Sequence, residues 1–299
     1  MVSEIAEQVL RFMRSLPEED GDTKPLEEQR AQSEIVWPLL TGDVPGSAFE
    51  AADAGGVPAE MVRTPESDPS AMLLYLHGGG YWAGSVTTHR KLVAQLCRRT
   101  GRTGLVISYR LAPEHPFPAA LDDALASYDW LVAKGFDPAR ITVAGDSAGG
   151  GLALALALRL REEHRSLPKA LVLFSPWTDL AMSGASIVAN RAIDPVIKIG
   201  EGESPAVRAY LGSSGTDVKD PLVSPLYGDL RGLPRMLVQV GSDEVLLDDS
   251  TRLVERARSA GVDVTLETWP GMFHVFQMGA GLLPEADEAM EHVAGWLGS

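Results

Sequence analysis

The chain has almost no cysteine, no excess of positive charge and no long apolar run. Cys97 is the single cysteine among 299 residues, which excludes an internal disulfide framework or a cysteine cluster for zinc. We expect its thiol to be buried filler. The net charge of −15 argues against nucleic acid and anionic membrane surfaces as partners. The longest apolar stretch, GLALALALRL, is too short to span a membrane, and the acidic N-terminus lacks a signal-peptide pattern. We therefore expect a cytoplasmic protein without membrane insertion.

From about residue 47 the sequence alternates between predicted strands and helices. Apolar strands without alternation are typical of a parallel sheet that is covered by helices on both faces. The length of the chain predicts one such α/β domain with a modest cap. The predicted strands are VPAEMVRT, AMLLYLH, GLVISYR, RITVAGD, KALVLFS, RMLVQVGS and VDVTLETW. This pattern predicts a doubly wound sheet.

Two segments do not follow the alternation. Residues 1–45 contain two amphipathic helical patterns, SEIAEQVLRFMRSL and a second from about Pro25 to Leu40, without a strand partner. Residues 181–217 carry scattered Gly and Ser and one short helical stretch, ESPAVRAYLG. Open α/β sheets bind ligands at the carboxyl ends of their strands. We expect both segments to form a cap there, on a core of residues 46–299.

A serine stands between a predicted strand and a predicted helix, in the sequence Gly145-Asp146-Ser147-Ala148-Gly149. This matches G-x-S-x-G, in which a sharp strand-to-helix turn presents the hydroxyl at the top of the sheet. A Gly-rich turn or a phosphate loop is the alternative, but a Walker loop would need a lysine that GDSAGGG lacks. The pattern predicts that Ser147 is a nucleophile at a helix N-terminus, where negative charge is favoured.

Three consecutive glycines follow the strand AMLLYLH directly, in the sequence LYLHGGGYWAG. Such a run weakens regular structure but lets backbone N–H groups approach a ligand closely. HGGG after a strand is an oxyanion-hole element of lipases and esterases; a flexible loop is the alternative. We expect Gly78 and Gly79, with Ala148, to donate to the oxyanion. Tyr81 and Trp82 either wall the substrate pocket or pack against the cap.

A nucleophilic serine needs a base and an acid that orients the base, and in this fold they follow in the order Ser, Asp/Glu, His. His274 follows a strand and a Pro-Gly turn, so we expect it to be the base; His292 lies in a terminal helix and His164 at the surface. Asp243 follows the strand RMLVQVGS, with Glu244 beside it. We expect Asp243 to be the acid.

Asp248 is the alternative acid, but together with Asp249 it falls in the first turn of a predicted helix. Charges of this kind at a helix N-terminus usually complement the helix dipole. Asp146, Glu114 and His115 lie beside the elbow or in the neighbouring PEH stretch, and we interpret them as structural residues that brace these loops.

The sequence resembles the bacterial hormone-sensitive-lipase-like esterases, a branch of the α/β-hydrolases. The resemblance spans about residues 73–276 and is carried by HGGGYWAGS, YRLAPEHPFPAALDDA, GDSAGGGLA, SPWTDL, DPLVSPL, GSDEVLLDD and GMFHVF. It implies an eight-stranded, mostly parallel sheet with a helical cap, and the triad Ser147, Asp243 and His274. Family members often carry Asp-Pro where this chain has Asp243-Glu244. They also often carry Gly after the catalytic histidine, where this chain has Val275.

The resemblance implies a serine hydrolase that cleaves carboxylic esters through an acyl-enzyme, and this mechanism needs no metal or organic cofactor. The short cap predicts substrates with short to medium acyl chains. A lactone hydrolase, deacetylase or amidase could use the same groups. Plant gibberellin receptors use this fold to bind a small molecule without turnover, but they lack the histidine that this chain has at position 274. The expected partner is a small-molecule ester. A homodimer paired through the last strand would fit the family.

Overall fold

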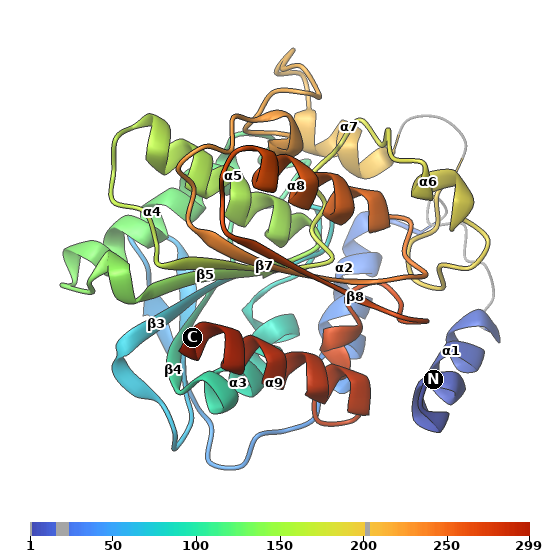
Figure 1. Cartoon of the computed structure of the whole chain (residues 1–299), viewed down its shortest axis with the longest axis horizontal. Helices are drawn as coiled ribbons and strands as arrows, with labels where there is room; N and C mark the ends of the chain where they lie inside the picture. Colours follow the sequence, from blue (N-terminus) through green and yellow to red (C-terminus); the bar gives the residue numbers. More distant parts are fainter. Residues whose placement is uncertain (1, 16–23, 201–203) are drawn as a thin grey trace.

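An eight-stranded sheet runs through the middle of the computed structural model, which describes residues 2–15, 24–200 and 204–299 (Figure 1). The strand order is β1-β2-β4-β3-β5-β6-β7-β8; β1 and β2 pair antiparallel, and β3 to β8 run parallel. The strands are β1 (Ala48–Asp53), β2 (Pro58–Arg63), β3 (Asp68–Leu76), β4 (Arg102–Ile107), β5 (Ile141–Asp146), β6 (Ala170–Phe174), β7 (Arg235–Gly241) and β8 (Val264–Trp269). The predicted mostly parallel α/β sheet is confirmed.

Helices cover both faces of this sheet. The helices α3 (Val86–Thr100) and α9 (Pro284–Gly298) lie on one face, and α4 (Ala119–Ala133), α5 (Ala148–Glu162) and α8 (Leu247–Ser259) lie on the other (Figure 1). Helix α5 is apolar around its whole circumference because it is buried between the sheet and its neighbours. Helix α3 begins at a capping box of Ser85 and Thr88 and ends at Gly101 in the left-handed conformation.

The parallel register brings the carboxyl ends of the central strands to one edge of the sheet. Leu76, the last residue of β3, is aligned with Gly145 of β5, and Asp146 of β5 is aligned with Phe174 of β6. On the neighbouring strands, Gly241 of β7 is aligned with Trp269 of β8. The loops that follow β3, β5, β7 and β8 therefore emerge together, which is where an open α/β sheet places its site.

The segments expected to form a cap contain short helices. The first holds α1 (Glu4–Ser15), α2 (Leu26–Val36) and a 3₁₀ turn at Trp37–Leu39; the second holds α6 (Ser186–Ala189) and α7 (Pro205–Leu211). Residues 1, 16–23 and 201–203 of these expected ranges lie outside the described residues. In the described part of the chain, no helix is both long and apolar enough to cross a membrane.

Candidate active site

Ser147 sits in the turn between β5 and α5, as the sequence predicted. Its backbone has φ 52° and ψ −121°, a conformation that a residue with a side chain rarely adopts. The turn is held because the Ser147 N–H donates to the Phe174 carbonyl at 2.9 Å. Glycine is required at position 149, since a Cβ there would overlap the Leu76 carbonyl oxygen. The turn leaves the Ser147 side chain partly exposed at the carboxyl edge of the sheet.

A chain of hydrogen bonds joins Ser147, His274 and Glu244. The His274 Nε2 atom lies 2.9 Å from Ser147 Oγ, and its Nδ1 atom lies 2.8 Å from Glu244 Oε2. His274 is 7% exposed and Glu244 is fully buried. The other carboxylate oxygen of Glu244 accepts from the Gly241 N–H at 2.6 Å and from the Ser175 hydroxyl at 2.7 Å. Both oxygens of the Glu244 carboxylate thus accept hydrogen bonds, and the carboxylate keeps a proton on Nδ1 of His274.

The structure corrects the choice of Asp243 as the orienting acid. Asp243 points away from His274: its Oδ1 accepts from the Ser242 hydroxyl at 2.9 Å, and its Oδ2 lies 3.7 Å from Arg14 Nη2. Glu244, the next residue, reaches the imidazole instead. The two acids are adjacent in a turn after β7, so the direction of that turn decides which one enters the site.

Residues of the 181–217 segment fix this turn. The Asn190 side-chain amide donates to the Ser242 and Glu244 carbonyls at 3.0 and 2.8 Å. The buried Asp194 carboxylate accepts from the Val245 N–H at 2.9 Å. Both contacts orient the backbone on either side of Glu244. The second segment therefore holds in place the turn that carries Glu244.

Two opposing effects act on the pKa of His274. Burial alone lowers this pKa, because a charged imidazolium is poorly solvated there. The hydrogen bond from His274 to Glu244 and the negative charges of Glu244 and Asp194 outweigh burial, and the net pKa is raised above the usual 6.5. The imidazole can therefore accept a proton from Ser147 and hold it as a stabilised cation.

The loop after β3 corrects one of the predicted oxyanion donors. The Gly78 N–H donates to Asp146 Oδ1 at 3.0 Å, so it is already occupied. The same oxygen accepts from the Tyr75 hydroxyl at 2.8 Å and faces His89 Nε2 at 3.3 Å. Burial would raise the pKa of Asp146, but the charge of His89 and these hydrogen bonds lower it, so the carboxylate stays ionised. Asp146 thus links the turn at Ser147 to the loop after β3 through the hydrogen bond from Gly78, which is the structural role predicted for it.

The N–H groups of Gly79, Gly80 and Ala148 remain available. None of the three donates to another residue within the described part of the chain. Gly79 has φ +110°, and a Cβ at this position would overlap the Ala83 carbonyl, so the turn requires glycine. Gly79 and Gly80 follow β3, and Ala148 is the first residue of the helix after the adjacent strand β5. Three donors beside a nucleophile can hold a developing negative charge. Gly80 is the one that sequence reasoning missed.

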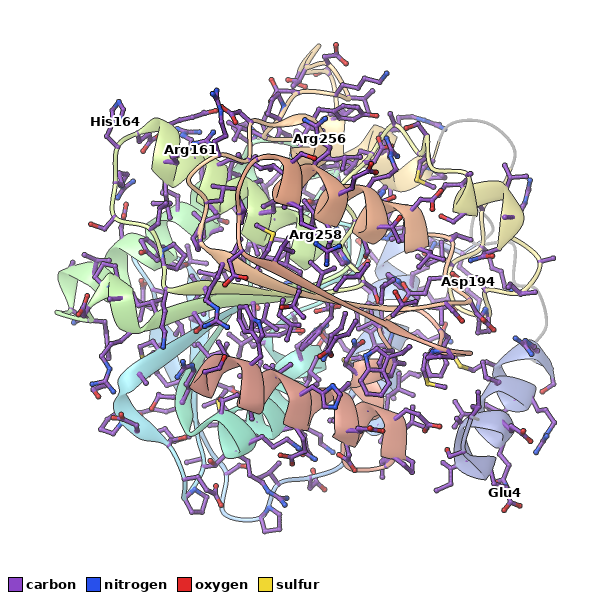
Figure 2. All side chains as sticks on the ribbon, viewed as in Figure 1. Glu4, Arg161, His164, Asp194, Arg256 and Arg258 are labelled. Carbon is purple, nitrogen blue, oxygen red and sulfur yellow. The ribbon has the colours of Figure 1, made fainter. Side chains whose placement is uncertain are left out.

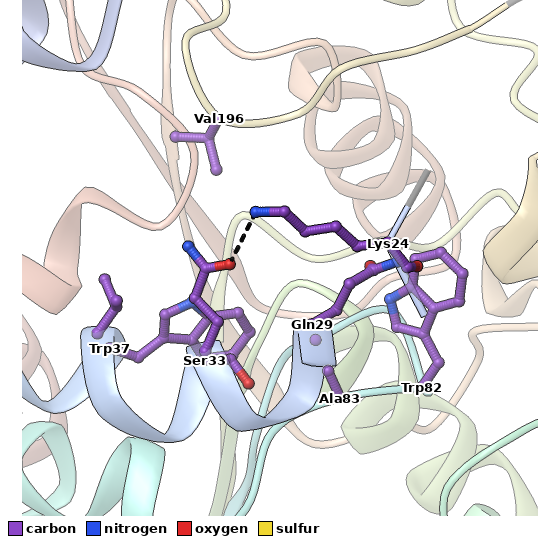
Figure 3. Close-up of a pocket in the computed structure, with 10 residues that line it drawn as sticks. Lys24, Gln29, Ser33, Trp37, Trp82, Ala83 and Val196 are labelled. Carbon is purple, nitrogen blue, oxygen red and sulfur yellow. Dashed lines mark hydrogen bonds between the residues drawn. The ribbon is translucent and has the colours of Figure 1, made fainter. Parts of the chain in front are cut away.

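Tyr81 and Trp82 lie in different environments. Tyr81 is 1% exposed and stacks on Tyr210 of α7 with ring centroids 3.8 Å apart, so it packs inside the protein against α7. Trp82 lines a cavity of about 440 Å³ between α2 and the oxyanion loop. Figure 3 shows Trp82 and Trp37 on this cavity, with the Lys24 side chain extending across it. The remaining lining residues are Gln29, Gln32, Ser33, Val36, Gly79, Ala83 and Val196.

The other candidate residues lie outside the site. His164 is exposed near the end of α5 at the edge of the molecule (Figure 2), and His292 on α9 pairs with Glu267 at 3.2 Å. Cys97 is fully buried, and burial raises the pKa of its thiol to about 12. None of the three is placed to take part in chemistry at Ser147.

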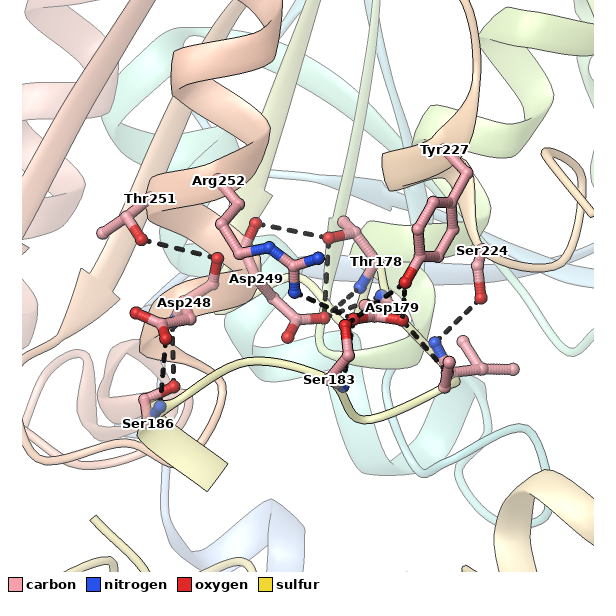
Figure 4. Close-up of polar contacts among 12 residues, drawn as sticks. Thr178, Asp179, Ser183, Ser186, Ser224, Tyr227, Asp248, Asp249, Thr251 and Arg252 are labelled. Carbon is pink, nitrogen blue, oxygen red and sulfur yellow. Dashed lines mark hydrogen bonds and ion pairs between the residues drawn. The ribbon is translucent and has the colours of Figure 1, made fainter. Parts of the chain in front are cut away.

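Two further buried acids, Asp179 and Asp249, lie at the loop that follows β6 (Figure 4). Asp179 accepts from Arg252 Nη1 at 2.9 Å and from the Tyr227 hydroxyl at 3.0 Å. Asp249 accepts the N–H groups of Thr178 and Asp179 at 2.7 and 2.8 Å. Burial raises the pKa of Asp249 to about 7. Asp249 therefore holds this loop through buried hydrogen bonds. It is not an exposed charge that complements the helix dipole.

Comparisons with known proteins identify the family of this chain. The alpha/beta hydrolase fold family matches residues 73–278. An acetyl-hydrolase of Streptomyces hygroscopicus is 46% identical over 90% of this chain and 94% of its own length. An esterase of Acinetobacter venetianus is 40% identical over 80% of this chain and 78% of its own length. The solved structure of an esterase from the bacterial hormone-sensitive lipase family is 40% identical and covers 99% of this chain and 98% of that chain, with a TM-score of 0.92.

The fold, the nucleophile elbow and the matched family define an α/β-hydrolase, and the chain belongs to that family. Within it, the chain is a carboxylic-ester hydrolase of the hormone-sensitive-lipase-like branch. The resemblance inferred from the sequence motifs is confirmed. The assignment of the orienting acid within those motifs is corrected, from Asp243 to Glu244.

Proposed function

We propose that the protein hydrolyses carboxylic esters through a Ser147-His274-Glu244 triad and an acyl-enzyme. His274 Nε2 takes the proton of Ser147 as Oγ attacks the ester carbonyl carbon. The tetrahedral oxyanion is bound by the N–H groups of Gly79, Gly80 and Ala148. The intermediate collapses, the C–O bond to the alcohol breaks, and His274 returns the proton to the departing alkoxide. Water then attacks the acyl-serine with His274 as base, which releases the acid and restores Ser147.

One observation carries this proposal: the continuous hydrogen-bonded chain from Ser147 Oγ through His274 to Glu244 Oε2, with lengths of 2.9 and 2.8 Å. A serine hydroxyl is a weak nucleophile without a base in contact, and the base needs a partner to fix its tautomer. Both conditions are met by residues that come from three different loops. A purely structural serine would not need this arrangement.

We further propose that the substrates are esters of short to medium acyl chains. The cavity beside Gly79 has a volume of about 440 Å³, which suits a small ester. Its walls combine the rings of Trp37 and Trp82 with polar groups from the start of α2. The similarity to a chain described as an acetyl-hydrolase supports a small acyl group.

The test is hydrolysis of p-nitrophenyl esters from acetate to palmitate by the wild-type protein and by Ser147→Ala. We expect kcat/KM to be highest for short chains, and turnover in the variant to fall to the level without enzyme. Equal rates in both proteins would show that Ser147 is not the nucleophile. A maximum at palmitate would refute the chain-length proposal and leave the triad intact.

A further inference from the structure

Arg30, on the cap helix α2, makes four hydrogen bonds to two loops at the carboxyl edge of the sheet. Its Nε donates to the Trp82 carbonyl at 2.7 Å, and its Nη2 donates to the Ala112 carbonyl at 2.8 Å. The guanidinium also pairs with both carboxylate oxygens of Glu114, at 2.7 and 2.8 Å. Trp82 belongs to the loop after β3, and Ala112 and Glu114 belong to the loop after β4.

The Trp82 carbonyl is part of the turn that presents the oxyanion donors. Within this turn, the N–H groups of Trp82 and Ala83 both donate to the Gly79 carbonyl, at 3.1 and 2.9 Å. The Ala112 N–H donates to the Tyr81 carbonyl at 2.9 Å, which ties the second loop to the first. The peptide group that carries the Gly79 carbonyl and the Gly80 N–H is thus fixed from inside the turn, and Arg30 holds the turn from outside.

The chemistry of this contact suits arginine. A guanidinium is planar and offers five N–H donors in a fixed arrangement, so it can hold two carbonyls and a carboxylate at once. The Arg30 side chain is 24% exposed and that of Glu114 is 54% exposed. The hydrogen bonds from Arg30 are the main reason that the pKa of Glu114 falls to about 2. The Glu114 carboxyl therefore stays ionised over the working range of an esterase, and its protonation does not release the contact.

We propose that Arg30 is a positioning residue for the oxyanion hole. It aims the Gly80 N–H, one of the proposed oxyanion donors, by holding the Trp82 carbonyl from α2, because the Ala83 N–H of the same peptide group donates to the Gly79 carbonyl. This inference rests on the proposed function of this N–H group. The same guanidinium holds α2 beside the cavity that Trp82 lines.

The first experiment separates binding of the ground state from stabilisation of the transition state. We would measure kcat and KM for p-nitrophenyl butyrate with Arg30→Lys, Glu114→Gln and the control Arg11→Lys. Arg11 also lies on an N-terminal helix, but it pairs with Glu7 at the surface, at 3.3 Å. Active sites are counted by a fluorophosphonate titration, so that unfolded protein does not affect kcat.

We expect Arg30→Lys to lower kcat about 10- to 100-fold with KM within about threefold, because losing one oxyanion donor outright costs about 10²–10³-fold. The three N–H donors of a lysine ammonium sit on one nitrogen and lack the spread of the guanidinium, which reaches the Trp82 and Ala112 carbonyls from two different nitrogens. Glu114→Gln leaves the hydrogen bonds from Arg30 to the Trp82 and Ala112 carbonyls in place, so we expect kcat to fall less than about threefold. The control should match the wild type. An unchanged kcat in Arg30→Lys, or a change in KM alone, would overturn the proposal.

The second experiment asks whether the lost activity belongs to the oxyanion hole. A trifluoromethyl ketone forms a tetrahedral adduct with an oxyanion, whereas butanol binds the pocket without one. We expect Arg30→Lys to raise the inhibition constant of the ketone by the same factor by which it lowers kcat/KM. The inhibition constant of butanol should stay unchanged. Equal weakening of both inhibitors would show a general loss of structure and refute the positioning role. Turnover by Ser147→Ala would instead refute the proposed function, independently of Arg30.

Discussion

The neighbouring acids Asp243 and Glu244 give the sharpest prediction, because the structure assigns one to the site and the other to the surface of the turn. Glu244→Gln replaces a carboxylate that accepts hydrogen bonds on both oxygens: from Gly241 N–H and Ser175 Oγ on one, and from His274 Nδ1 on the other. An amide has one oxygen, so its NH₂ must face one of these donors. With its oxygen on Gly241 and Ser175, the NH₂ group faces Nδ1 and forces the proton of His274 onto Nε2.

A histidine in that tautomer cannot accept the proton of Ser147. A comparable loss of the correct tautomer in a serine hydrolase costs about 10⁴-fold in kcat, which is about 5 kcal/mol of activation free energy. Asp243→Asn removes a carboxylate that accepts from Ser242 Oγ and lies 3.7 Å from Arg14, so we expect less than about a threefold change in kcat. The assay is steady-state hydrolysis of p-nitrophenyl butyrate. A large loss in Asp243→Asn together with a small loss in Glu244→Gln would refute the reasoning.

Three further predictions follow from buried titratable groups. Since Glu244 raises the pKa of His274, the acidic limb of the kcat/KM profile should lie above pH 6.5; a limb below 6 would contradict this. Burial raises the pKa of Asp249 to about 7 from its usual 3.8, so the folded state binds more protons than the unfolded state between these values, and stability falls as pH rises through that range. Asp249→Asn should remove this pH-dependent loss of stability. In urea unfolding at pH 8, its free energy of unfolding should exceed that of the wild type by at most about 4 kcal/mol. An equal difference at pH 4 and pH 8 would refute the prediction. The thiol of Cys97, whose pKa is about 12, should react with Ellman's reagent only after unfolding, and rapid labelling of the native protein would be contrary to its burial.

The strands and the nucleophile elbow could be predicted from local pattern because their physics is local. An apolar run followed by G-x-S-x-G describes β5, the turn at Ser147 and helix α5 without reference to the rest of the chain. The edge strand β1 was not predicted, because its residues AFEAAD are mostly exposed and show no apolar pattern. It exists because it pairs with β2, and a single sequence window does not contain that information.

The details of the site depend on contacts between distant residues. The sequence Asp243-Glu244 offers two acids, and the choice is made by Asn190 and Asp194, which orient the turn from about 50 residues away. Likewise, HGGG offers three N–H groups, and Asp146 on the neighbouring strand occupies the first of them. A pattern can therefore identify the catalytic loops, while tertiary hydrogen bonds select the working atoms within each loop.

The role of Ser147 can be tested most directly by trapping the acyl-enzyme. Wild-type protein would be mixed with p-nitrophenyl acetate, quenched with acid within the first turnover, and examined by intact mass spectrometry and peptide mapping. We predict the added mass of one acetyl group, located on Ser147 and absent from Ser147→Ala. Burst release of p-nitrophenol with no adduct, or an acetyl group on another residue, would contradict the proposed mechanism.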